Sequence, residues 1–307
     1  MKNLPLVSIC SITYNHAPFI RQCLEGFLMQ QTNFPIEIII NDDCSIDGTT
    51  EIIREYAEKY PDKIFPIFHE ENLYSQGIRG MFQRFVFPKA RGKYIAICEG
   101  DDYWTDPLKL QKQVDFLESH PDYSMCFHKA KIMVQDGRKY DDPFSRLEER
   151  EYFPEEILIP WIIPTASIMM RTSVRVPFHK DFRTGDVVVH AACVEKGRVY
   201  CMKEEMSIYR LHGTGWSAIQ HNPTDTLSSF VPHYLAMMEV FPKKVTKFMK
   251  KHVATCCYLW LRHFLKYRKL ISIRYLPKAL YYCNVTLLWL LIYYPLLKVC
   301  CRLNLRH

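Results

Sequence analysis

Gly92–Trp104, GKYIAICEGDDYW, combines an apolar strand with a cluster of acids. Tyr94–Cys98 is a short apolar run of the length of a buried strand. Glu99, Asp101 and Asp102 follow it directly, and carboxylates so close together repel one another. A hard divalent cation with oxygen ligands stabilises such a group. The stretch therefore predicts a metal site or, alternatively, a solvated turn.

Apolar runs and helical patterns alternate on the amino-terminal side of this stretch and just beyond it. Expected strands cover Leu6–Tyr14, Ile36–Ile40, Ile64–Phe68 and Tyr94–Cys98. Expected helices cover Pro18–Gln30, a segment capped by Asp47 and ending at Tyr60, Gly77–Lys89, and Pro107–His120. This alternation predicts an α/β fold with a mostly parallel, Rossmann-like sheet flanked by helices.

Polar clusters follow three of the expected strands: Thr13-Tyr14-Asn15, Asp42-Asp43 and Glu99–Asp102. Ligands of parallel sheets bind beyond the carboxyl ends of the strands, so the clusters predict one site. Asp42 and Asp43 either cap the next helix or accept hydrogen bonds from a nucleobase on which Tyr14 stacks. The chain has no GxGxxG after its first strand and no GxxxxGK[ST], which disfavours dinucleotide and P-loop sites.

An aromatic pair, Tyr103-Trp104, comes directly after the acids. An aromatic ring beside an acidic site is a common way to hold a sugar. The pair therefore favours a carbohydrate substrate, with Trp104 as the expected contact to the acceptor.

The composition of the 307 residues, 48% hydrophobic and 24% charged, excludes a disordered chain and a collagen-like one. The net charge of +7 is divided unevenly. After Glu239 there are 14 Lys and Arg and no acid, so the first 240 residues carry 26 − 33 = −7. The twelve cysteines show no zinc-ligand spacing, and the first residues show no signal-peptide pattern, which favours reduced thiols in the cytosol.

The basic end of the chain, residues 243–307, has long apolar stretches between its charges, and these favour lipid over nucleic acid. Ala279–Leu297 is 19 residues without a charge, close to the length of a spanning helix, although Asn284 and Pro295 interrupt it. We expect helices lying on an anionic membrane surface, and thus a cytoplasmic, peripheral protein. A single spanning helix and a soluble appendage that forms a homodimer interface are the alternatives.

Four motifs together resemble the family 2 glycosyltransferases with the GT-A fold. They are VSICSITYN at Val7–Asn15, IIINDDCSIDGT at Ile38–Thr49, GKYIAICEGDDYW at Gly92–Trp104, and the segment Gly185–Ser217, which begins with GD and ends with YRLHGTGWS. The resemblance covers roughly residues 5–220. It implies a GT-A domain over 1–220, followed by a basic α-helical extension over 221–307.

For the donor, the resemblance implies that Tyr14, Asn15 and Asp43 hold the nucleobase of a nucleotide-sugar. An arginine ahead of GKYIA often contacts the nucleotide in this family. Arg84 is the expected residue here, and Arg79 stays open because the spacing does not choose between them.

For the chemistry, the resemblance implies that Asp101 and His212 bind a divalent metal, Mn²⁺ or Mg²⁺. Glu99 and Asp102 would contact the nucleotide-sugar. Glu99 stands where the family more often has Asp, so its reach toward the metal or the ribose is left open. Asp186, in the TGD motif, corresponds to the general base. A helix-capping role is the structural alternative for Asp186.

The resulting expectation is transfer of a sugar, with a UDP-sugar as the first candidate donor, to a hydroxyl of a polysaccharide or lipid-linked acceptor with inversion. A non-catalytic nucleotide-sugar or glycan-binding scaffold is one alternative, but it has no need of Asp186. A sugar nucleotidyltransferase is another, but such enzymes usually carry a Gly-rich basic loop after the first strand, which TYNHAPF lacks.

Overall fold

The computed structural model describes residues 4–249, except 136, 138, 159–161, 214–222, 242 and 243. These residues fall into two compact units. One comprises residues 4–178 and 184–213 and contains the whole sheet. The other comprises residues 179–183 and the described residues from 223 onward, including helix α6 (Pro223–Val240). None of the helices in the described ranges has both the length and the apolar character that crossing a bilayer requires.

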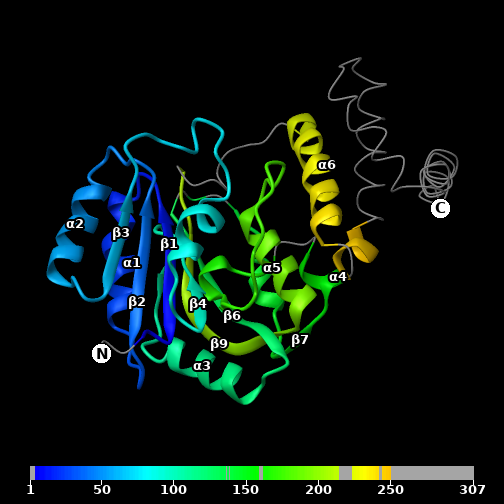
Figure 1. The fold of residues 1–307 in the computed structure, drawn as a ribbon, viewed down its shortest axis with the longest axis horizontal. Helices are drawn as coiled ribbons and strands as arrows, with labels where there is room; N and C mark the ends of the chain where they lie inside the picture. Colours follow the sequence, from blue (N-terminus) through cyan, green and yellow to red (C-terminus); the bar gives the residue numbers. More distant parts are fainter. Residues whose placement is uncertain are drawn as a thin grey trace, which may run out of the picture. The chain divides into compact units, whose positions relative to one another are not determined.

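The first half of the sheet is parallel, as the sequence predicts (Figure 1). Its order is β3-β2-β1-β4, and its members are β1 (Val7–Thr13), β2 (Ile36–Asp42), β3 (Ile64–Phe68) and β4 (Tyr94–Ile97). Val7 pairs with both Ile36 and Tyr94, and Thr13 pairs with Asp42. The register therefore brings the carboxyl ends of these strands to one edge.

Helices cover both faces of this half. α1 (Ala17–Leu28) buries Ile20, Leu24 and Phe27 in the same core cluster as the β1 and β2 residues Val7, Ile9, Ile38 and Ile40. Burial of one such side chain stabilises the fold by about 1.5–3 kcal/mol. α2 (Thr49–Lys59) packs against α1 and β3. The short helix η1 (Phe82–Val86) packs against β1 and β2, and η2 (Phe87–Lys89) packs against η1.

Two predicted helices differ from the structure. The helix predicted over Gly77–Lys89 forms only from Phe82, because Gly77 and Gly80 adopt φ of 85° and 73°. Pro88 then lacks the N–H that a regular helix needs, and the segment ends as a 3₁₀ turn. The helix predicted from Pro107 begins two residues later, as α3 (Lys109–Ser119).

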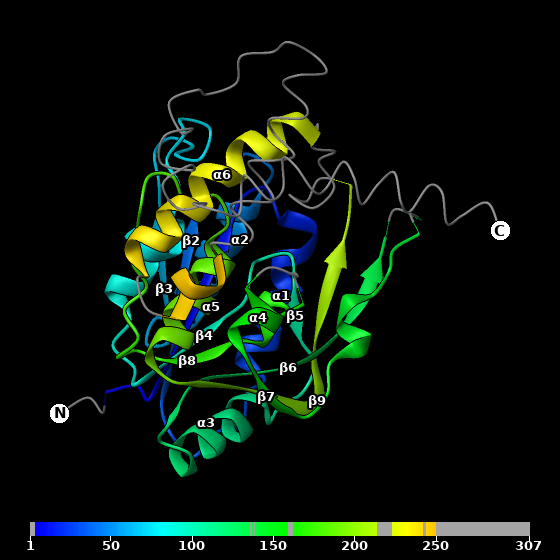
Figure 2. The same cartoon turned by 90° about the vertical axis from the view of Figure 1, so that its right-hand side faces the viewer.

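The second half of the sheet is mixed, and its order continues from β4 as β8-β6-β9-β5, with β7 paired to β9. Its strands are β5 (Tyr103–Trp104), β6 (Tyr123–Val134), β7 (Arg150–Tyr152), β8 (Met169–Arg171) and β9 (Arg198–Leu211). β6 and β9 run side by side in parallel, with register shifts (Figure 2). β8 joins both β4 and β6 antiparallel, and this strand connects the two halves.

The sheet-bearing unit also contains α4 (Pro154–Ile157), α5 (Gly185–Lys196), η3 (Pro143–Arg146) and η4 (Thr165–Ser167). The seven described cysteines are free thiols, and all but Cys44 are buried. The domain boundary predicted at 220 falls in residues 214–222, and most of the predicted basic extension likewise lies outside the described residues.

Candidate active site

The acidic loop after β4 runs alongside the carboxyl end of β1. The Cys98 amide donates to the Cys10 carbonyl (3.2 Å) and the Gly100 amide to the Ile12 carbonyl (3.0 Å). A Cβ at Gly100 would lie 2.8 Å from the Thr13 side chain, so glycine is what allows this close approach. The loop thus presents its acids at the edge where the parallel strands end.

The three carboxylates of this loop, Glu99, Asp101 and Asp102, form the acidic triad. One ligand oxygen of each lies within 4.8 Å of the others. Burial, together with the charges of Asp101 and Asp186, raises the pKa of Glu99 to about 8. Burial, then the Asp101 charge, raises the pKa of Asp102 well above its usual range.

Asp101 differs from its two neighbours because histidines surround it. Burial acts to raise the pKa of its carboxyl, but the hydrogen bond from His212 and the charges of His16 and His212 lower the pKa on balance. His212 Nε2 lies 3.2 Å and His16 Nε2 lies 3.7 Å from Asp101 Oδ2. Asp101 is therefore held ionised while its neighbours are disfavoured as anions.

The donor set of the triad fits a hard divalent cation. Asp102 is 1% exposed, and its Oδ2 has no hydrogen-bond partner. An orphaned buried carboxylate oxygen is costly unless a proton or a cation satisfies it. Oxygen ligands at this spacing are those that Mg²⁺ and Mn²⁺ prefer.

Asp186 approaches the triad from the second half of the sheet. Its helix α5 begins at Gly185 with Thr184 as the N-cap residue, so Asp186 lies in the first turn, where a negative charge is favoured. Asp186 Oδ1 accepts the Val187 amide (2.9 Å), and its charge acts on Glu99. Thr184 is the N-cap residue but makes no side-chain capping hydrogen bond, so Asp186 contacts an amide of the first turn with one of its oxygens.

On the donor side, the predicted residues are placed at the ends of β1 and β2, but two of them already bind the backbone. Tyr14 is 42% exposed. Asp43 is buried, and its two oxygens accept the amides of Leu73 (2.9 Å) and Tyr74 (3.0 Å). Asn15 has φ of 54°, and its Oδ1 accepts the Ile46 amide (2.9 Å). Asp43 and Asn15 therefore shape the loops around the exposed ring of Tyr14.

The two candidate arginines lie in different places. Arg79 stacks on Tyr74 with its guanidinium carbon 3.8 Å from the ring centroid, and donates to the Tyr74 carbonyl (2.6 Å). Arg84 lies over Phe85 and Phe178, at 5.5 and 5.1 Å from the ring centroids. Of the two arginines, Arg79 contacts Tyr74, the residue whose backbone amide donates to Asp43.

Trp104 is a core residue, which contradicts its predicted contact with an acceptor sugar. Only 1% of it is exposed, and its Nε1 donates to the Ala166 carbonyl (2.8 Å). Its ring lies 4.8 Å from that of Phe27. The period-two alternation of β5 turns Trp104 inward and leaves Tyr103 half-buried.

Two residues that the sequence reasoning did not select belong to the site. His16 directly follows the TYN motif and contacts Asp101. Arg210, two residues before His212 in YRLH, donates its amide to Asp102 Oδ1 (2.9 Å) and its guanidinium to the Asp101 carbonyl. The position of each beside a selected motif was the available signal, but their contacts span long stretches of sequence.

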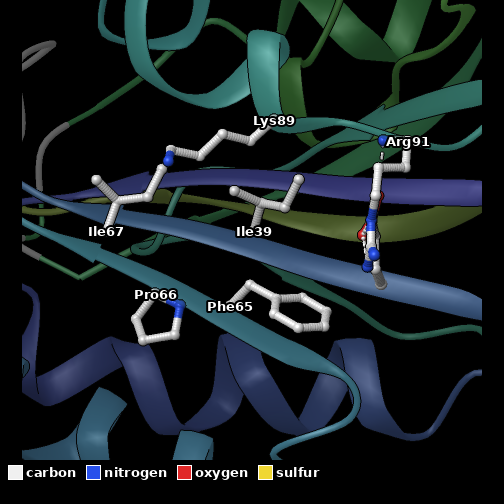
Figure 3. A pocket seen from close by; sticks show the side chains of 7 residues that line it. Ile39, Phe65, Pro66, Ile67, Lys89 and Arg91 are labelled. Atoms are coloured by element: carbon white, nitrogen blue, oxygen red, sulfur yellow. Dashed lines mark hydrogen bonds and ion pairs between the residues drawn. The ribbon is translucent and has the colours of Figure 1, made fainter.

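A cavity of about 240 Å³ lies elsewhere on the sheet (Figure 3). Lys89 extends across Ile39 and Ile67 at this cavity, and Arg91 closes one end with an ion pair to Glu37. Glu37 is near the amino end of β2, whereas the triad follows the carboxyl end of β4. The cavity is therefore separate from the candidate active site.

Comparison with known proteins gives a consistent result. Residues 8–177, more than half of the chain, match the family described as Glycosyl transferase family 2. An uncharacterized protein of Mycobacterium tuberculosis is 41% identical over 214 residues, which cover 68% of this chain and 60% of that protein. The putative teichuronic acid biosynthesis glycosyltransferase TuaG of Bacillus subtilis is 30% identical over 67% of this chain and 79% of its own length.

Solved structures share the fold. S. aureus TarS 1-349 in complex with UDP-GlcNAc matches 90% of this chain and 79% of its own, with a TM-score of 0.59 and 18% identity. The mannosyltransferase PcManGT of Pyrobaculum calidifontis, in complex with GDP-Man and Mn²⁺, matches 94% and 88%, with a TM-score of 0.55 and 16% identity. This likeness confirms the fold class predicted from the motifs.

Proposed function

The chain belongs to glycosyl transferase family 2, and from this premise we propose that it transfers a sugar from a nucleoside-diphosphate sugar to a hydroxyl group of a polysaccharide or lipid-linked acceptor. The observation that carries the proposal is the acidic triad, with the charge of Asp186 acting on one of its members, Glu99. The acidic triad comes from the parallel half of the sheet, and Asp186 comes from α5 beside the second half. A metal-assisted displacement needs both groups in one place.

Asp101 and His212 are the proposed metal-binding residues, with Asp102 Oδ2 as a further oxygen within reach. A bound Mn²⁺ or Mg²⁺ supplies positive charge that offsets the charge developing on the departing diphosphate. His16 and His212 keep Asp101 ionised, so the protein holds a carboxylate ready for the cation. The charges of Asp101 and Asp186 both act on Glu99, and we propose that Glu99 faces the donor sugar or ribose.

Asp186 is the proposed general base. A sugar hydroxyl is a weak nucleophile at neutral pH, and removal of its proton by a positioned carboxylate typically accelerates transfer by about 10²–10⁴-fold. The acceptor oxygen gains its bond to the anomeric carbon as the bond to the diphosphate oxygen breaks, and the proton passes to Asp186. Attack from the face opposite the leaving group inverts the anomeric centre.

For the nucleotide, we propose that the exposed ring of Tyr14 stacks on the base. Asp43 and Asn15 would shape the surrounding loops, and Arg79 rather than Arg84 would face the donor. A UDP-sugar is the first candidate on family grounds. Because the solved relatives hold UDP-GlcNAc and GDP-Man, both belong in the first panel of donors.

We also propose that residues 243–307, which carry 14 Lys and Arg and no acid, bring the enzyme to an anionic membrane surface. Each basic residue near such a surface contributes about 1 kcal/mol. The full chain should sediment with vesicles of phosphatidylcholine and phosphatidylglycerol, and salt should release it. Equal binding to pure phosphatidylcholine vesicles would contradict this proposal. A dimeric protein that binds neither kind of vesicle would contradict it as well.

The test of the transfer reaction is release of nucleoside diphosphate by the purified full chain. UDP-, GDP- and TDP-sugars are each supplied with Mn²⁺ or Mg²⁺, in the presence of lipid. We expect metal-dependent release from one donor, lost in Asp101→Ala and in Asp186→Asn.

Glu118→Gln is the matched control, because this surface carboxylate pairs with Lys93 (2.7 Å) and with the Tyr94 side chain, at the amino end of β4. It should behave like the wild type. Nucleoside diphosphate release that needs no metal, or that survives both active-site substitutions, would reject the mechanism.

A further inference from the structure

Arg210, in β9, is a buried arginine that donates hydrogen bonds to two successive residues of the acidic loop, Asp101 and Asp102. It is 4% exposed. Its backbone amide donates to Asp102 Oδ1 (2.9 Å), and its Nη1 donates to the Asp101 carbonyl oxygen. Its Nη2 donates to Gln22 Oε1 on α1. One residue of the second half of the sheet thus connects the loop of the first half to a helix.

Aromatic rings fix the plane of this guanidinium. The Arg210 carbon Cζ lies 4.4 Å from the Tyr103 ring centroid and 5.2 Å from that of Phe19. The Phe19 ring in turn lies 4.5 Å from the ring of His212. A planar guanidinium held by hydrogen bonds and rings has little freedom, which suits it to fixing the geometry of a loop.

The charge of Arg210 is not used in a simple ion pair. None of the salt bridges within the described ranges includes it, although three carboxylates belong to the adjacent loop. Its side chain donates to a carbonyl and an amide oxygen instead. Two residues further along, His212 contacts the Asp101 carboxylate. Arg210 therefore holds the backbone of Asp101, and His212 holds its side chain.

We propose that Arg210 is a positioning residue that sets the orientation of Asp101 and Asp102 toward a divalent cation. This inference rests on the metal site of the proposed function and adds the residue that prepares that site. Arg210 would act through the loop and would not itself bind the cation.

A purely electrostatic role makes the opposite prediction. A fixed positive charge repels a cation, so its removal in Arg210→Gln would then strengthen metal binding, and Arg210→Lys would change nothing. Positioning predicts that both variants bind metal more weakly, because neither retains the planar fork that spans Asp101 and Gln22.

The experiment is a titration of the full chain with Mn²⁺ alone, with free Mn²⁺ measured by electron paramagnetic resonance. We expect the dissociation constant to rise about 10–100-fold in Arg210→Lys and Arg210→Gln, as is typical when a partner of a metal ligand is lost. Gln22→Leu removes the second anchor of the same guanidinium from an exposed helix position. It should weaken binding in the same direction by a smaller factor.

Arg171→Lys is the matched control. Arg171 also donates to backbone carbonyls, those of Tyr123, Leu117 and His120, but it lies in β8 away from the loop. It should lower the melting temperature and leave the Mn²⁺ affinity unchanged. If the Arg210 variants lose only stability, as Arg171→Lys does, or if Arg210→Gln binds Mn²⁺ more tightly, the inference is wrong.

The result also separates this inference from the proposed function. Wild-type binding that the Arg210 substitutions do not weaken rejects the inference alone. A wild type that binds no Mn²⁺ rejects the metal site and the inference together. Weakened Mn²⁺ binding in a protein that releases no nucleoside diphosphate supports the inference and rejects the transferase.

Discussion

The two halves of the sheet hold their polar residues in different ways. In the parallel half, several partners are close in sequence: Asp42 accepts from Ser45 and Thr50, and Asp47 accepts the amide and hydroxyl of Thr49, although Asp43 accepts the Leu73 amide across 30 residues. In the mixed half, partners are remote: the amide of Arg210 reaches Asp102 across 108 residues. Hydrogen bonds within the first half shape its loops, and residues of the second half then hold these loops in place.

This difference assigns separate tasks to the halves. The strand ends of the parallel half carry the triad and the exposed ring of Tyr14, which are the parts proposed to hold donor and metal. The mixed half contributes Arg210 from β9, His212 directly after β9, and Asp186 from α5. Substitution of Tyr14 should therefore affect donor binding and substitution of Asp186 should affect chemistry, whereas the proposed metal site takes Asp101 from one half and His212 from the other. The predictions below test this comparison.

The largest effect is expected for Asp186→Asn. The amide is nearly the same size as the carboxylate but cannot accept the proton of the acceptor hydroxyl, so kcat should fall by about 10²–10⁴-fold. Donor KM and Mn²⁺ affinity should change little. Steady-state kinetics with the donor found in the panel checks this.

Glu195→Gln, near the other end of α5, is the control and should keep wild-type kcat. If Asp186→Asn instead raises donor KM at constant kcat, Asp186 belongs to the donor site and the division between the halves fails.

Trp104→Phe tests the joint between the halves. The Trp104 ring packs on Phe27 of α1, and its Nε1 donates to Ala166 of η4, so it contacts both. Loss of the hydrogen bond and of ring volume should cost about 1–3 kcal/mol of unfolding free energy. Urea denaturation measures this, with Tyr103→Phe as the near-neutral control. A loss of acceptor use at unchanged stability would instead restore the sugar-binding role that its burial contradicts.

The parallel half was largely predictable, because its signals are local. Continuous apolar runs identify the buried strands, and the acids fall at strand ends by simple counting. The segment Gly77–Lys89 was predicted as a full helix, since its apolar spacing outweighs two glycines whose positive φ only tertiary contacts reveal.

The mixed half was less predictable, for physical reasons. Whether Trp104 faces solvent depends on which strand pairs with Tyr103–Trp104, and that strand is β9, about a hundred residues away. The contacts of His16 and Arg210 with Asp101 likewise depend on chain closure. Asp186 and His212 were selected only through resemblance to a family, because spacing alone does not bring them to the triad.

A smaller effect is expected for Tyr14→Ala. If the 42% exposed ring stacks on the nucleobase, its loss should weaken donor binding by roughly 1–3 kcal/mol, about 30-fold at the centre of that range. Donor KM should rise, whereas kcat and Mn²⁺ affinity should hold. Tyr14→Phe retains the ring and should retain the affinity. A fall in kcat with unchanged KM would show that this strand end serves the chemistry rather than the donor.

The smallest effect concerns Lys109, which lies in the core where the halves meet. It is fully buried, its Nζ donates to Gln113 Oε1 (2.7 Å) and lies 4.0 Å from the Trp104 ring centroid. Burial lowers the pKa of this amine to about 7, although Cys98, Cys126 and Asp106 act to raise it. In the unfolded chain the pKa of lysine is about 10.4.

Between these two values the unfolded state binds a proton that the folded state does not. The stability of the wild type should therefore rise with pH from about 7 toward 10, by at most about 1.4 kcal/mol per pH unit, and fall as pH decreases through the same window. Lys109→Met fills the same space without a titrating group. Urea unfolding of both proteins at pH 8 and 9 isolates the effect, because other groups titrate in both. The wild type should gain stability relative to Lys109→Met over this interval. Parallel changes would mean that Lys109 keeps its proton in the fold, and that the joint between the halves contains a buried positive charge.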